Sequence, residues 1–248
     1  MLGHIMRVCA IIPTYNHVAR LAQICEALRA LGLDVLIIDD GNSEPMLSQI
    51  AALHAPHAGI FVVRRDQNGG KGAAMQTGFH AALGRLYTHA LQIDADGQHD
   101  LADVPTFLAA ANSQPEAFVC GWAHYDHTVP KARRYGRAIT HFWVWVETCA
   151  FDIQDSMCGL RVYPLEAVAS LLKGGRRLGM RMDFDIEIAV RLHWRGVRVI
   201  SLPTHVAYPA GNSSNFQMLR DNVRISWLHT RLVFEAPCRL AAKALKQR

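Results

Sequence analysis

Residues 8–16 read VCAIIPTYN, and this stretch sets the pattern for the first half of the chain. The apolar run from Val8 to Ile12 is continuous, which is typical of a strand buried on both faces of a sheet. Pro13 ends the run, and polar residues follow it at once. We therefore predict a buried strand whose carboxyl end carries a polar cluster.

The same arrangement recurs along the next eighty residues, with helical periodicity between the apolar runs. We predict alternating helices and strands at 21–31, 35–38, 46–53, 60–63, 73–83 and 91–93. Such alternation is typical of a parallel sheet covered by helices. The fold class is therefore α/β, and ligands of these folds bind at the carboxyl ends of the strands.

The second half of the chain is less regular, and it shows no repeat, linker or composition shift. We predict further strands at 118–120, 160–163 and 197–200. We predict further helices at 137–150, 184–193 and 216–234. We expect one domain at 7–210, preceded by a leader or expression remnant at 1–6. A basic helical segment follows at 211–248.

Composition excludes several classes of protein. Half of the 248 residues are hydrophobic and 19% are charged, which excludes a globally disordered, collagen-like or coiled-coil chain. No apolar run reaches the roughly 20 residues of a transmembrane helix, and no secretory signal is present. The six cysteines form no CxxC pair. A zinc ribbon or disulfide framework is therefore disfavoured, and a reduced cytoplasmic compartment is expected.

The net charge of +5 is concentrated at the C-terminus. Residues 216–248 contain seven Lys or Arg and two Asp or Glu, whereas the other 215 residues contain 19 of each sign. A neutral body with a basic end indicates an anionic partner, either a membrane or a nucleic acid. In the helix predicted at 216–234, Arg220, Arg224 and Arg231 fall within roughly 40° of one another. We predict that this basic stripe binds an anionic membrane, unless its arginines pair with carboxylates of the domain.

The sharpest local signal is the segment IDADGQ at 93–98. Extended geometry would turn Asp94 and Asp96 to the same side at the mouth of the sheet. Two carboxylates there suit a hard divalent cation, which can neutralise a diphosphate leaving group. A simple turn that favours Asp and Gly is the alternative interpretation.

Three other polar clusters fall at predicted strand ends or helix starts. Glycines in NGGKG at 68–72 precede a helix and could expose backbone N–H groups to phosphate, beside the cation of Lys71. PTYN at 13–16 follows the first strand, and DDGN at 39–42 follows the second. Tyr15 could pack on a base, and a carboxylate could accept a base N–H. Each cluster alone could equally be a turn.

Taken together, PTYN, IIDDG, NGGKGAAMQTGF and DADGQH resemble the motifs of family 2 glycosyltransferases in order and spacing. They are most similar to the dolichyl-phosphate mannosyltransferase-like branch. The segments DSMCGLR at 155–161 and FDIE at 184–187 extend the resemblance, which covers roughly residues 7–200. His17 and Asn42 stand where the family pattern usually has Glu and Ser.

The resemblance implies a GT-A fold with a mixed, mainly parallel sheet, a nucleotide-diphosphate sugar donor, and Mg²⁺ or Mn²⁺. It implies that Asp94 and Asp96 bind metal and diphosphate, with Gln98 as an extension of that motif. The expected donor-binding residues are Pro13, Tyr15, Asn16, Asp40, Gly70, Lys71 and Asp94.

The resemblance also implies displacement at the anomeric carbon with inversion. A hydroxyl acceptor would need a general base, whereas a phosphate acceptor is already ionised and needs none. The candidate bases are Glu187, Asp185 and Asp155, and Glu187 is named first only because it lies in the FDIE motif. Each has a structural alternative, such as a turn for Asp155 or a helix position facing an arginine for Glu187.

Arg133 and Arg137 lie at the start of a Trp-rich helix, where they could clamp a donor or acceptor phosphate. The alternative is a solvated basic turn.

The sequence therefore predicts a metal-dependent inverting glycosyltransferase. Its acceptor would be a lipid or polyprenyl phosphate, and it would be cytoplasmic and peripheral at the inner membrane. A soluble or protein acceptor, or a non-catalytic binding protein of the same fold, is the alternative. A nucleic-acid-binding protein is a further alternative, but no nucleic-acid-binding motif supports it.

Overall fold

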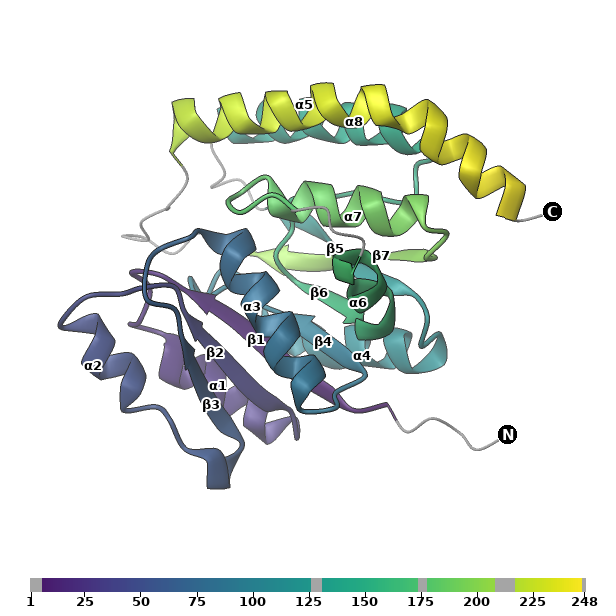
Figure 1. The fold of residues 1–248 in the computed structure, drawn as a ribbon. Helices are drawn as coiled ribbons and strands as arrows, with labels where there is room; N and C mark the ends of the chain where they lie inside the picture. Colours follow the sequence, from purple (N-terminus) through teal and green to yellow (C-terminus); the bar gives the residue numbers. More distant parts are fainter. Residues whose placement is uncertain (1–5, 126–130, 174–177, 208–216, 247–248) are drawn as a thin grey trace.

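The computed structural model describes residues 6–125, 131–173, 178–207 and 217–246, without the side chains of 125, 131–134 and 242–246. Its centre is a seven-stranded sheet in the order β3-β2-β1-β4-β6-β5-β7 (Figure 1). Only β6 runs antiparallel to its neighbours among the described strands. The strands are β1 (Val8–Thr14), β2 (Asp34–Asp39), β3 (Ile60–Arg64), β4 (His89–Gln92), β5 (Phe118–Tyr125), β6 (Arg161–Pro164) and β7 (Val199–Val206).

Helices cover both faces of the sheet. One face carries α1 (Leu21–Ala30), α2 (Met46–Ala51) and α4 (Val104–Ser113), whose buried residues share one apolar cluster. The other face carries α3 (Lys71–Gly84), α6 (Leu165–Lys173) and α7 (Phe184–Trp194). Two long helices, α5 (Lys131–Thr148) and α8 (Met218–Lys246), lie side by side over α7 as an outer layer (Figure 1). The short 3-10 turns Pro56–Ala58 and Leu101–Asp103 complete the described elements.

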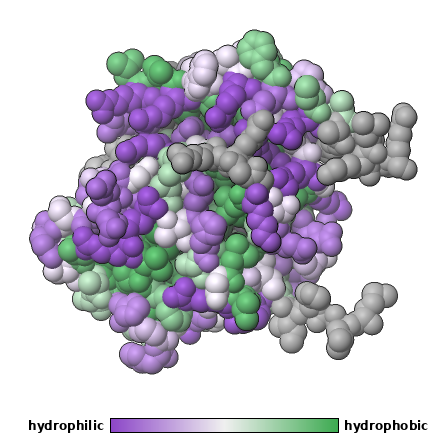
Figure 2. Space-filling model, in the orientation of Figure 1, coloured by the Kyte–Doolittle hydropathy of each residue, from purple (hydrophilic) through white to green (hydrophobic). Residues whose placement is uncertain are grey.

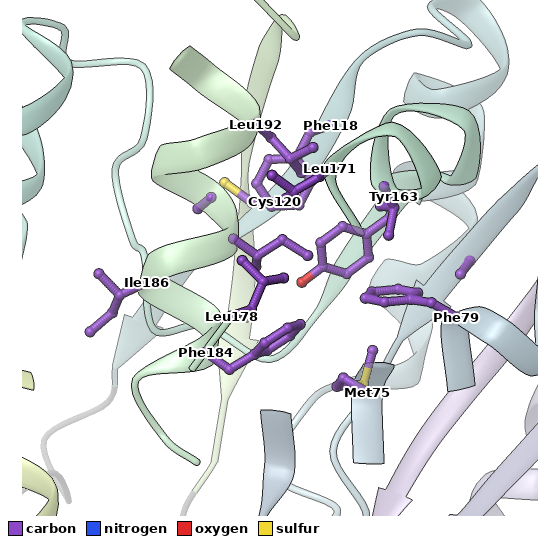
Figure 3. Packing of buried hydrophobic residues seen from close by; sticks show 14 of the residues in the cluster. Met75, Phe79, Phe118, Cys120, Tyr163, Leu171, Leu178, Phe184, Ile186 and Leu192 are labelled. Atoms are coloured by element: carbon purple, nitrogen blue, oxygen red, sulfur yellow. The ribbon is translucent and has the colours of Figure 1, made fainter. Parts of the chain in front are cut away.

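The core on the α3 and α7 face joins residues from distant parts of the sequence. Tyr163 of β6 lies between Phe79 and Phe118, with both ring-centroid distances at 5.0 Å (Figure 3). Leu228 and Leu232 of α8 belong to the same buried cluster. The inner side of α8 therefore packs as part of this core.

The order β3-β2-β1-β4 places the topological switch point between β1 and β4. The chain runs outward from β1 through β2 to β3, and then returns to the other side of β1 as β4. Ligands of open α/β sheets bind outside the carboxyl ends of strands at such a point. The polar clusters predicted after β1, β2 and β4 all lie at this position.

The predicted α/β class, the mainly parallel sheet and every predicted helix and strand are confirmed, with shifts at their ends. Strand β5 extends to Tyr125 because it pairs in parallel with β7 along its whole length, although Gly121 and His124 interrupt its apolar run. Helix α8 continues through Pro237 to Lys246, beyond the predicted end at Phe234. Helices α4 and α6 were not predicted. Among the described residues, no helix combines the length and hydropathy needed to cross a bilayer.

Candidate active site

The turns after β1 and β2 are tied together by Asn42. Its side-chain amide donates to the Thr14 carbonyl (3.0 Å) and to Asp39 Oδ1 (2.7 Å), and its Oδ1 accepts from the Asn16 amide (2.8 Å). Asn16 has a φ of 59°, a left-handed conformation that asparagine tolerates. The asparagine at 42 therefore fixes the turn that presents Tyr15, which a serine side chain is too short to do.

Asp40 organises the glycine loop before α3. Its buried carboxylate accepts hydrogen bonds from Arg65 Nε (2.8 Å), Asn68 Nδ2 (3.1 Å) and the backbone amides of Gly69 (3.0 Å) and Gly70 (2.7 Å). These four donors fill the acceptor positions of a carboxylate. The Gly70 amide is therefore engaged by Asp40, which corrects the expectation that this amide is exposed for phosphate.

The glycines of this loop instead allow a close approach of the segment 178–181. A Cβ on Gly70 would lie 2.7 Å from the Met180 carbonyl oxygen, and one on Gly72 would overlap Gly179 and Phe184. Gly70 also has a φ of 94°, which favours glycine. The first turn of α3 is therefore packed directly against this segment.

Lys71 lies between two carboxylates. Its Nζ is 2.7 Å from Asp94 Oδ1 and 2.7 Å from Asp185 Oδ2. Burial alone would lower the pKa of Lys71, but the charges of Asp185 and Asp94 outweigh it and raise the pKa. Lys71 is therefore a permanent cation that anchors Asp94 at the end of β4.

The carboxylate oxygens of Asp94 and Asp96, at the end of β4, are suitable ligands for a hard divalent cation. Burial and the nearby charge of Asp94 raise the pKa of Asp96, as expected for two carboxylates that share a site. Among the described residues, no three His, Cys, Asp or Glu side chains gather as a metal cluster. Two carboxylates still suit Mg²⁺ or Mn²⁺ when a diphosphate and water complete the coordination. The backbone of Gln98 donates to Asp96 Oδ1 (3.0 Å) and accepts from Ala207 (3.0 Å), which ties this loop to β7.

Asp185 is the centre of a buried polar network. Its carboxylate accepts from Gln92 Nε2 (3.0 Å) and contacts Lys71 and Arg161, while its carbonyl accepts from Arg161 Nη1 (2.7 Å). Arg161 is fully buried, and Tyr163 donates to Gln92 Oε1 (2.9 Å). Asp185 therefore positions Lys71, and these contacts favour a structural role for its carboxylate.

Glu187 is also buried and fully engaged. Its Oε2 accepts from the Gly179 amide (2.6 Å), and its Oε1 accepts from Arg191 Nε (2.7 Å) and Arg231 Nη2 (2.7 Å). The residue has no exposed surface. These contacts favour a structural role for Glu187, and its role as a general base stays a prediction. The helix position facing an arginine is what the structure shows.

A cavity of about 330 Å³ opens beside Asp155. It is lined by Trp122 and His124 of β5 and by Arg137 and His141 of α5. Arg137 Nη1 lies 2.7 Å from Asp155 Oδ2, and His141 Nε2 lies 3.2 Å from Oδ1. Burial would raise the pKa of Asp155, but Arg137, followed by His141, holds it well below its usual range. Arg133 lies in α5, and its side chain is outside the described set.

His99 was missed by the sequence analysis and links the two parts of the site. Burial lowers its pKa to about 4, and the charges of Asp94, Arg137 and Asp155 all act on it. Gly159, four residues after Asp155, lies so close to the Asp94 carboxylate that a Cβ would overlap it. The cavity and the Asp94 carboxylate are therefore neighbours. In the sequence, His99 is the last residue of the DADGQH segment, but the sequence analysis did not single it out as a site residue.

Comparison with known proteins decides the family. The model of glycosyl transferase family 2 matches residues 9–167. The chain belongs to this family and is a glycosyltransferase. It is 25% identical over 242 residues to a dolichyl-phosphate beta-glucosyltransferase of Dictyostelium discoideum, covering 87% of this chain and 72% of that protein. It is 33% identical over 110 residues to an undecaprenyl-phosphate mannosyltransferase of Micrococcus luteus, covering 44% and 45%.

The GT-A fold implied by the motifs is also confirmed. The crystal structure of glucosyl-3-phosphoglycerate synthase from Mycobacterium tuberculosis in complex with Mn²⁺ and UDP-glucose superposes with a TM-score of 0.62. The sequence identity is 14%, and the match covers 96% of this chain and 79% of that one. At this low sequence identity, the structural similarity supports a shared fold and nothing more about function.

Proposed function

We propose that this glycosyltransferase moves a sugar from a nucleotide-diphosphate sugar to the phosphate of a lipid-linked acceptor. The observation that carries the proposal is the cavity in which Arg137 and His141 are held by Asp155. Guanidinium and imidazole groups are phosphate ligands, and the cavity adjoins Asp94 through Gly159. Relatives named for dolichyl-phosphate and undecaprenyl-phosphate acceptors support this chemistry.

The burial and ion pairing of the three candidate bases support a phosphate acceptor. Asp155, Asp185 and Glu187 are all buried and paired with cations. The pKa of Asp155 is lowered, so this carboxylate is a weak proton acceptor. A phosphate needs no base, because its ionised oxygen attacks the anomeric carbon directly. The configuration at that carbon inverts as the diphosphate leaves.

The donor is proposed to bind where the ends of β1, β2 and β4 converge. Tyr15 and Pro13 would contact the base, and Asp40 would act by shaping the turn and glycine loop around it. Asp94 and Asp96 would hold Mg²⁺ or Mn²⁺, which would supply positive charge to stabilise the diphosphate leaving group. Lys71 keeps Asp94 ionised and oriented for that role.

The outer surface of α5 and α8 is proposed to dock on an anionic membrane. Leu219, Val223, Trp227 and Phe234 are 61–79% exposed and span about 80° of the outward side of α8. Tyr135, Ile139, Phe142 and Val146 form a similar exposed row on α5. Figure 2 shows apolar residues among hydrophilic ones along this edge of the molecule. Such a mixed surface suits the interface of a bilayer.

The basic stripe of α8 is smaller than the sequence predicted. Arg231 pairs with Glu187, and Arg224 lies 3.3 Å from Asp221 of its own helix. Of these two residues, only Arg231 pairs with a carboxylate of the domain, as in the alternative interpretation, because Asp221 belongs to α8 itself. We infer that exposed apolar side chains contribute more to docking than the stripe does.

Docking can be tested by sedimentation with vesicles of rising anionic lipid content. Trp227→Ser combined with Ile139→Ser should weaken binding. Leu86→Ser, which removes an apolar side chain with 73% exposure outside α5 and α8, is the matched control. Equal binding by the two variants would reject this docking surface.

The acceptor can be tested by mass spectrometry of reactions in detergent. UDP-, GDP- and dTDP-sugars are each offered with polyprenyl phosphate, with polyprenol and with a soluble sugar phosphate. The proposal predicts a glycosylated polyprenyl phosphate and no product from polyprenol. Transfer to the free alcohol, or to the soluble phosphate alone, would overturn it.

A further inference from the structure

The segment 178–181 lies between α7 and the glycine loop of the proposed donor site. The Met180 carbonyl accepts a hydrogen bond from the Ala73 amide (3.0 Å) in the first turn of α3. Arg181 Nη1 donates to Asn68 Oδ1 (2.9 Å), and Asn68 in turn donates to Asp40. A displacement of this segment would therefore move the first turn of α3, where Lys71 holds Asp94.

Glu187 holds this segment from the opposite side. Its Oε2 accepts the Gly179 amide at 2.6 Å, which is a short, charge-assisted hydrogen bond. Its Oε1 is shared by Arg191 of the same helix and by Arg231 of α8. Arg191 also contacts Glu235 of α8 (3.1 Å). The described segment is therefore fixed through Glu187 to the outer helix.

Arg231 differs from Arg224 in its ion-pair partner, which belongs to another helix. Its side chain is 39% exposed, yet its Nη2 reaches a carboxylate that has no exposed surface. Arg224 on the same helix lies 3.3 Å from Asp221, three residues away. Arg231 thus connects α8 to α7 and the donor loop, whereas the ion pair between Arg224 and Asp221 lies within α8.

We propose that Arg231 and Glu187 are positioning residues for the nucleotide sugar. They make α8 a structural part of the donor site, although neither residue touches the donor. The inference rests on the proposed donor site at the glycine loop. Loss of the Arg231 guanidinium leaves Glu187 held by Arg191 alone, so the carboxylate no longer fixes Gly179 in one place. Donor binding should weaken, and acceptor binding at Arg137 should not.

The test compares Arg231→Gln with Arg224→Gln, since both remove one positive charge from α8. Donor affinity is measured by titrating nucleotide sugar in the presence of Mn²⁺, and the acceptor KM is measured separately. Arg231→Gln should raise the donor Kd about fivefold or more, with Arg224→Gln unchanged. Arg231→Lys, which keeps a cation, should recover part of the loss. Hydrogen exchange of the peptide containing residues 178–183 should be faster in Arg231→Gln only.

Equal donor Kd values and equal exchange in the two Gln variants would overturn the proposal. So would a loss of donor affinity in Arg231→Gln that disappears at a temperature well below its Tm, where the variant is fully folded. If the wild type binds no nucleotide sugar, the proposed function fails. The exchange of residues 178–183 then still decides whether Arg231 fixes this segment.

Discussion

Replacing Arg137 by methionine removes the main cationic partner of a buried carboxylate while keeping much of the side-chain volume. Asp155 is 1% exposed, and its Oδ2 lies 2.7 Å from Arg137 Nη1. After the replacement, Asp155 keeps only His141 and backbone amides such as that of Met157 (2.9 Å). Breaking a buried ion pair costs roughly 3–5 kcal/mol. Because the Arg137 side chain is 20% exposed, we expect about 3 kcal/mol at pH 7.

A double-mutant cycle with Asp155→Asn isolates the pair. In the Asp155→Asn background the carboxylate charge is absent, so Arg137→Met should cost only about 1 kcal/mol. Urea denaturation at pH 7 measures all four free energies of unfolding. A separate enzyme assay should show a raised KM for polyprenyl phosphate and an unchanged donor Kd in Arg137→Met. Equal costs in the two backgrounds would refute the electrostatic account.

The pH dependence gives an independent check. The folded-state pKa of Asp155 is depressed, so the stabilisation is present above the unfolded pKa of about 3.9. As pH falls toward the folded pKa, the unfolded chain binds a proton that the native state does not, and the stabilisation is lost. The difference in free energy of unfolding between wild type and Arg137→Met should therefore shrink as the pH falls from about 5 to about 3. A constant difference across this window would contradict the assignment.

Three other replacements probe the donor side. Asp96→Ala should abolish Mn²⁺-dependent nucleotide binding with little change in Tm. If the variant still binds Mn²⁺ and transfers sugar, Asp96 is not a metal ligand. Asp40→Asn should lower stability by about 1.5–3 kcal/mol and weaken donor binding together, because four donors face its carboxylate; unchanged urea denaturation would contradict this. Gly159→Ala should displace Asp94 and reduce donor affinity measured by calorimetry, and wild-type affinity would show that the contact is not needed.

The sequence predicted that the proposed donor residues lie together at one edge of the sheet, because its signals there are local. Each polar cluster directly follows a buried strand or precedes a helix, so the parallel sheet alone brings Tyr15, Asp40 and Asp94 to one edge. The departures from the family pattern were also visible, and the structure explains one of them. Asn42 spans from β2 to Thr14 and Asn16, which is a contact that a family motif does not reveal.

The roles of the later motifs could not be predicted, because their partners lie far away in the sequence. Glu187 is neutralised by Arg231, 44 residues downstream, and Asp185 is held by Arg161 and Lys71. A carboxylate in a family motif therefore looked catalytic until its partners were placed. The exposed side of α5, which carries Phe142 and Trp143, also depends on a distant segment, because the packing of α8 decides which side of α5 is covered.

The most direct test of the central claim is the pH dependence of kcat/KM for the acceptor, measured with polyprenyl phosphate and with the corresponding phosphonate. If the acceptor itself is the nucleophile and no protein carboxylate acts as base, the acidic limb follows the second ionisation of the acceptor. The midpoint of this acidic limb should lie at about pH 6 for the phosphate and move to higher pH with the more basic phosphonate. A limb that stays at one pH for both acceptors would show that a protein base controls the reaction, and would contradict the account.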